Sequence, residues 1–98
     1  MSSSHNKYNT PKNAMDLMNM AEKVFDESNF TLSVQYFTHA IKQIKSPMNL
    51  AYALYMRGCA YKELGKPSSA RKDWLQAKGL GFEHPWSIDL IADALNKL

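Results

Sequence analysis

Histidine and cysteine are the residue types here with the widest chemical repertoire, and the chain has few of them. His5, His39 and His84 are scattered, without metal-ligand spacing to one another, to the single Cys59 or to paired acids. We expect a solvated His39, an His84 at a helix start, and a buried or half-buried structural thiol at Cys59. No glycine-rich phosphate loop follows a strand, because the sequence has no convincing strands. The sequence therefore predicts no enzyme, no metal site and no cofactor.

Length and composition indicate one small domain. With 98 residues the chain reaches the size at which a single core suffices, and its one cysteine excludes an internal disulfide. Residues 1–10 are polar and lack apolar periodicity, so we predict a disordered N-terminal tail before a single domain at 11–98. No apolar run approaches the ~18 residues of a membrane span, and the start does not resemble a signal peptide. We expect a soluble, intracellular protein of the cytoplasm with no membrane partner.

A formal net charge of +3 and a pI near 9.0 raise the question of nucleic-acid binding. Acidic residues gather in the first predicted helix, and basic residues are more frequent between Lys62 and Lys78. No arginine-rich run or stripe of bases and aromatics is present, so we expect a solvated surface and no nucleic-acid partner. RNA binding through the later bases is kept as a third functional class, which predicts affinity that falls steeply with salt.

Apolar periodicity and helix-breaking residues predict an all-α chain of about five helices. Pro11 suits the first turn of a helix at about residues 11–27, and Asn29 or Thr31 can cap a second one that ends near residue 44. Residues 45–49 form a predicted connection in which proline ends the helix. Residues 54–80 hold two more helices, and a last helix at 85–98 begins at Pro85.

The stretch at 54–80 is divided by Gly65-Lys66-Pro67. Gly65 suits a left-handed cap after the earlier helix, and Pro67 fits the first turn of the later one. Small side chains let two antiparallel helices approach closely, and large ones fill the space beside them. Gly58, Ala70 and Ala77 supply the small contacts, and Tyr61 and Trp74 the large ones. The sequence therefore predicts a tightly packed helical hairpin.

Gly58-Cys59-Ala60-Tyr61 followed by Ala70-x3-Trp74 resembles the G-x2-Y … A-x3-F skeleton of the tetratricopeptide (TPR) repeat family. The resemblance implies a TPR-like helical hairpin. The chain departs from the family pattern at Arg57, where leucine is usual, and at Phe82, where proline usually closes the repeat.

A second copy lies 37 residues earlier. Ser33, Phe37 and Ala40 repeat the spacing of Ala70, Trp74 and Ala77, and Ala21 then corresponds to Gly58. We predict repeat one at about 14–47, repeat two at about 51–83, and a capping helix at 85–98 that covers the end of the array. The three residues beyond the usual ~34 are assigned to the 45–49 connection. Residues 14–45 taken alone also resemble the three-helix microtubule-interacting-and-trafficking domain.

Several residues have predicted structural roles. Arg57 would lie opposite Asp73 in such a hairpin, so we expect a partly buried and bidentate ion pair. The alternative is an Arg57 side chain that runs along its own helix to solvent. The full structural set is Ala21, Ser33, Phe37, Ala40, Arg57, Gly58, Tyr61, Gly65, Ala70, Asp73, Trp74, Ala77 and Trp86.

In TPR proteins the first helices of successive repeats line a concave groove, and the resemblance implies one here that is rich in Met and Tyr. Mapped through Gly58 and Ala21, its positions are Met15, Met18, Glu22, Phe25, Tyr52, Tyr55, Cys59 and Lys62. Such a surface suits a short hydrophobic motif. The alternative is that some of these residues are core, covered by the N-terminal segment or by the last helix.

Two functional classes follow from this fold. The first is a protein-interaction module, an adaptor, scaffold or assembly factor that binds a peptide or helix of a protein partner without catalysis. The second is a self-associating subunit, a homodimer through the first or last helix. Binding of a heat-shock chaperone C-terminal tail is not expected. That binding mode needs side chains that donate hydrogen bonds to the terminal carboxylate, and the matching positions here are Met18, Glu22 and Met56.

Overall fold

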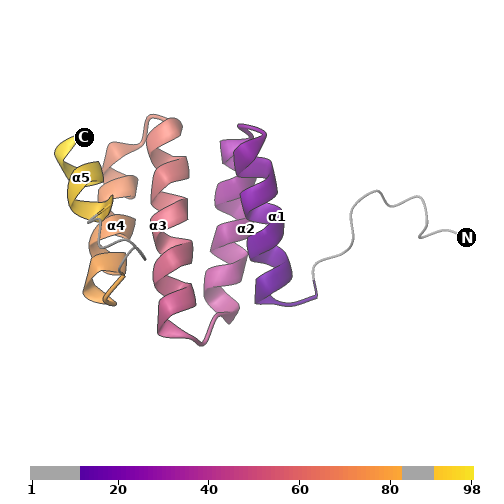
Figure 1. The fold of residues 1–98 in the computed structure, drawn as a ribbon. Helices are drawn as coiled ribbons and strands as arrows, with labels where there is room; N and C mark the ends of the chain where they lie inside the picture. The colour runs from indigo at the N-terminus through magenta and orange to yellow at the C-terminus, as the bar shows by residue number, and fades with distance from the viewer. Residues whose placement is uncertain (1–11, 83–89) are drawn as a thin grey trace, which may run out of the picture.

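The computed structural model describes residues 12–82 and 90–98, and every regular element in these ranges is a helix. The elements, in chain order, are α1 (Ala14–Asp26), α2 (Phe30–Gln43), α3 (Pro47–Glu63), α4 (Pro67–Gly79) and α5 (Leu90–Asn96). Figure 1 shows them side by side, with α1 and α2 at one end of the row and α5 at the other. The predicted all-α fold class is confirmed.

Contacts between helices follow the order of the chain. α1 packs on α2 and α3 packs on α4, so that each pair forms a hairpin. The first hairpin joins the second through α2 and α3, and α5 lies against α4. The predicted helix at 85–98 is described only from Leu90 onward, and Trp86 and His84 lie outside the described residues.

Helix starts differ from the prediction at two places. α1 begins at Ala14, because the Asn13 side chain accepts a hydrogen bond from the Asp16 N–H at 2.9 Å and caps the helix there. Pro11 lies outside the described residues. The connection predicted at 45–49 is wrong in extent, since Ser46 caps α3 and Pro47 is its first residue. The proline therefore starts a helix, and the extra residues lengthen α3.

The turn between α3 and α4 has the predicted chemistry. Gly65 adopts a left-handed conformation with φ of 73°, and Pro67 is the first residue of α4. The N–H of Lys66 donates to the Tyr61 carbonyl, and that of Gly65 donates to the Lys62 carbonyl, both at 2.9 Å. These two bonds form a Schellman motif, which satisfies carbonyls that the end of α3 leaves unpaired.

The small residues predicted between the helices are buried. Ala21, Ser33, Phe37 and Ala40 are fully buried in the first hairpin. Gly58, Ala70, Trp74 and Ala77 are buried in the second. A Cβ atom built on Gly58 would lie 2.5 Å from Trp74 Nε1, so this glycine permits the close approach of α3 to the indole ring.

Candidate docking groove

Four helices surround a cavity of about 300 Å³. Its lining residues, which we call the docking cavity, are Phe25, Tyr55, Cys59, Lys62, Glu63, Trp74, Ala94 and Lys97. The structure thus brings together four of the predicted groove residues: Phe25, Tyr55, Cys59 and Lys62. A volume near 300 Å³ is at the small end of ligand sites, with room for one or two side chains of a partner.

The central wall of the cavity comes from α3. Tyr55, Cys59 and Lys62 are spaced at i, i+4 and i+7, so they lie on one face of this helix. Phe25 near the end of α1 lies on one side, and Ala94 of α5 on the other. The cavity therefore exists only because the first hairpin, the second hairpin and α5 meet around α3.

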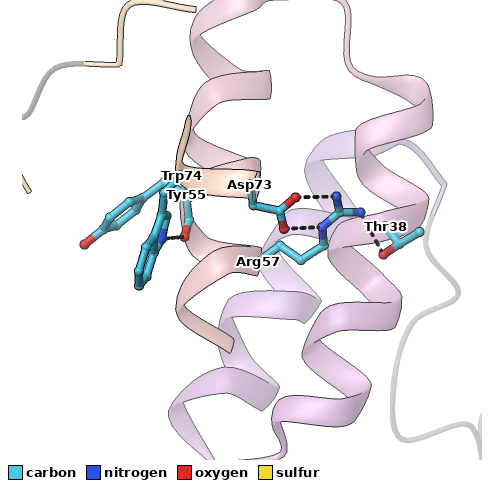
Figure 2. Close-up of polar contacts among 5 residues, drawn as sticks. All are labelled: Thr38, Tyr55, Arg57, Asp73 and Trp74. Atoms are coloured by element: carbon cyan, nitrogen blue, oxygen red, sulfur yellow. Dashed lines mark hydrogen bonds and ion pairs between the residues drawn. The ribbon is translucent and has the colours of Figure 1, made fainter. Parts of the chain in front are cut away.

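Aromatic contacts hold the walls in place. The buried Trp74 donates its indole N–H to the Tyr55 carbonyl at 3.1 Å, which joins α4 to α3 (Figure 2). The Tyr55 ring stacks on Phe82, with centroids 5.0 Å apart, and Phe25 makes an edge contact with Phe30 at 5.1 Å. Aromatic side chains fixed in this way give a preformed apolar surface, which lowers the entropy lost on binding.

Cys59 is a protonated thiol in this setting. Burial raises its pKa, and the neighbouring Tyr55 and Trp74 side chains and the charge of Lys62 only partly oppose that effect. Because the thiolate is the nucleophilic form, the neutral thiol is a weak nucleophile at pH 7. Its half-buried position agrees with the predicted structural thiol.

Tyr52 and Glu22 tie the two hairpins together. The Tyr52 hydroxyl donates to Glu22 Oε2 at 2.6 Å, from α3 to α1. Burial is the largest cause that raises the pKa of Tyr52, followed by this hydrogen bond and the charge of Glu22. Both residues belong to the predicted groove, but neither lines the cavity.

The two methionines of the predicted groove have different positions. Met18 is only 3% exposed and belongs to the core cluster of the first hairpin, so its assignment to the groove is wrong. It directly follows Leu17 and lies one turn before Ala21, in a cluster that also contains Phe37 and Ala40 of α2 and Ala53 of α3, where burial of a large apolar side chain is favourable. Met15 is 51% exposed and does not line the cavity.

The predicted Arg57–Asp73 pair is confirmed. Arg57 Nε and Nη2 donate to the two carboxylate oxygens of Asp73, each at 2.7 Å, in a bidentate pair (Figure 2). Arg57 Nη1 also donates to Thr38 Oγ1 at 3.2 Å, and the guanidinium lies 5.7 Å from the Tyr61 ring centroid. The hydrogen bonds with Asp73 raise the pKa of Arg57. One side chain therefore connects α2, α3 and α4.

Sequence reasoning missed part of the cavity. Glu63, Ala94 and Lys97 line it without having been predicted, and Trp74 was predicted as structural only. Ala94 of α5 and Lys97 just after it could not be identified from their spacing, because their place at the cavity depends on how α5 packs against α4. Thr38 had no signal, because its bond to Arg57 depends on how α2 packs against α3.

Two other kinds of site are absent from residues 12–82 and 90–98. Within these ranges, no three His, Cys, Asp or Glu side chains come close enough together to hold a metal ion. No helix of the same ranges combines the length and the apolar character needed to cross a membrane.

Comparisons with known proteins returned no similar chain: no protein-family model matches, and neither does any curated protein or solved structure. The resemblance to tetratricopeptide proteins therefore depends on the residues quoted above.

Proposed function

We propose that this chain is a TPR-like protein-interaction domain that acts by binding and not by catalysis. Its docking cavity would take one large apolar side chain from a peptide or helix of a partner protein. The observation that carries the proposal is the convergence of Phe25, Tyr55, Cys59 and Lys62 on one cavity of about 300 Å³. The family resemblance implies a groove that contains the same four positions.

The chemistry of the lining supports binding. Aromatic rings and a neutral thiol form the walls, and three charged side chains line the same cavity, so an apolar anchor with polar flanks fits it. Preformed walls held by the Trp74 hydrogen bond and the Tyr55–Phe82 stack suit recognition without large rearrangement. Catalysis is not favoured, because the raised pKa of Cys59 makes it a poor nucleophile.

The proposal is tested by filling the cavity. In an Ala94→Phe variant, the added ring occupies space that a partner side chain would need. Leu75→Ala is the matched control, since Leu75 is an exposed apolar residue of α4 outside the cavity. Proteins captured from native lysate by the wild type and by Leu75→Ala should be lost from Ala94→Phe.

Equal recovery of every partner by the three baits would contradict the proposal. Thermal unfolding of each bait, followed by circular dichroism, separates lost binding from lost folding. Sedimentation of the purified chain over a range of concentrations distinguishes a monomeric binding module from a homodimer.

A further inference from the structure

Charges of opposite sign flank the docking cavity. On α1, Glu22 lies three residues before Phe25, which lines the cavity, and four residues before Asp26, so Glu22 is a neighbour of both on the helix surface. Glu22 accepts the hydrogen bond of the Tyr52 hydroxyl, and Asp26 lies one turn further along α1. We call this pair the acidic side.

The central wall from α3 and the α5 side of the cavity carry positive charge. Lys62, in the last turn of α3, and Lys97, just after α5, both line the cavity and are exposed. We call them the basic side. Glu63 also lines this part of the cavity, and its negative charge leaves the three lining residues with a net charge of +1, from two lysines and one glutamate.

We propose that the groove orients its partner by charge. The occupant is a peptide segment of a protein partner with one large apolar side chain, a Lys or Arg on the flank that faces Glu22 and Asp26, and an Asp or Glu on the flank that faces Lys62 and Lys97. This inference rests on the proposed function, because it assumes that the cavity holds the apolar anchor.

Reversal of the segment would place like charges together on both flanks. Charged residues at the rim of an interface select register and orientation more than they add affinity, and like-charge contacts are unfavourable. The apolar anchor would then supply most of the binding energy, and the two charged flanks would decide which way the segment lies.

The test uses a phage-displayed library of random 16-residue peptides, selected on the wild-type chain. Binders that also recognise Ala94→Phe are removed, and the remaining peptides are synthesised. Each peptide is compared with a second one in which its acidic and basic residues are exchanged, at low and high salt. Asp26→Lys, Lys62→Glu and the double variant are measured beside the wild type, since both side chains are exposed.

We expect selected peptides to carry a base and an acid on opposite flanks of an apolar residue. Exchange of their charges, like each single charge reversal of the protein, should weaken binding about fivefold at low salt and less at high salt. The exchanged peptides should regain affinity on the Asp26→Lys/Lys62→Glu double variant.

Equal affinity of the parent and exchanged peptides for the wild type would overturn the charge inference and leave the cavity as a docking site. Failure to recover any peptide that Ala94→Phe excludes would contradict the proposed function itself, and the charge inference with it.

Discussion

The two helical hairpins have corresponding residues 37 positions apart in the sequence but are held together by different contacts. Ala21 and Phe37 of the first correspond, 37 residues earlier, to Gly58 and Trp74 of the second. All four are buried. In the second hairpin the large Trp74 ring is accommodated by Gly58, which has no Cβ atom. In the first hairpin the smaller Phe37 ring leaves room for an alanine at the corresponding position, Ala21. Size at one helix is matched by space at the other, as close packing requires.

The polar contacts differ more than the packing does. Arg57 and Asp73 of the second hairpin correspond to Met20 and Tyr36 of the first, which are half-buried. The first hairpin is joined instead by the buried Ser33 hydroxyl, which donates to the Ala21 carbonyl at 3.0 Å. A buried ion pair depends on both partners, whereas apolar contacts at the same level tolerate substitution.

Among the variants considered, removal of the Asp73 carboxylate should lower the free energy of unfolding the most. Asp73→Ala would leave the largely buried Arg57 charge without its bidentate partner, and we expect a loss of about 3 kcal/mol in the free energy of unfolding. The double variant Arg57→Met/Asp73→Tyr gives the second hairpin the residues of the first and should stay within about 1 kcal/mol of wild type. Urea denaturation measures both, and a double variant as unstable as Asp73→Ala would contradict this account.

Substitutions at the packed pair Gly58 and Trp74 should have the second largest effect on stability. Gly58→Ala places a Cβ atom against the Trp74 ring, and we expect it to destabilise by about 2 kcal/mol despite the better helix propensity of alanine. Trp74→Phe in the same chain recreates the Ala–Phe pairing of the first hairpin. A double-mutant cycle should show favourable coupling of about 1 kcal/mol or more, and strict additivity would mean that the clash is relieved elsewhere.

The turns that follow α1 and α3 have the same backbone conformation but different residues at one corresponding position. Ser28 corresponds to Gly65, and both have a left-handed backbone, with φ of 62° and 73°. The N–H groups of Ser28 and Asn29 donate to the Phe25 and Val24 carbonyls at 2.8 Å, so the end of α1 has the same motif as that of α3. Ser28→Gly should stabilise by about 1 kcal/mol, and Gly65→Ser should destabilise by about as much.

Thermal melts of the two single variants check this prediction directly. Changes of the same sign at both positions would show that backbone conformation does not decide their effect.

Loss of the Tyr52–Glu22 hydrogen bond, which joins the two hairpins, should have the smallest effect on stability. Tyr52→Phe removes the hydrogen bond to Glu22, and we expect a loss of about 1 kcal/mol at neutral pH. Because the pKa of Tyr52 is raised in the folded chain, the unfolded chain loses this proton first, so the stability that the group contributes below about pH 10 is lost at higher pH. Stability measured from pH 8 to 11 should therefore fall less steeply in the variant than in the wild type.

The sequence was most informative where local rules act. Gly65 in its turn and Pro67 at a helix start follow from backbone chemistry and were predicted correctly, and Asn29, one of the two caps predicted for α2, is the one observed. The Arg57–Asp73 pair was predicted because a charge on an inner face needs a nearby partner. At Pro47 the proline was assigned to a helix end, because the cap at Ser46 was not recognised.

The candidate site was less predictable, because it depends on tertiary packing. Met15 and Met18 share helical spacing with Phe25, and only the placement of α1 on α2 decides that one is exposed and the other is core. Ala94 and Lys97 reach the cavity through the position of α5 against α4, which no local pattern encodes. Spacing identified the α3 wall, and the walls from other helices required the fold.

The central claim is that partners dock in the cavity around α3, and Cys59 reports on it directly as the only cysteine in the chain. The measurement is the rate at which a methanethiosulfonate reagent modifies Cys59, with and without a saturating peptide selected on the wild type. We predict that the bound peptide slows modification in proportion to occupancy. An unchanged rate at saturation would show that the peptide binds elsewhere and would contradict the account.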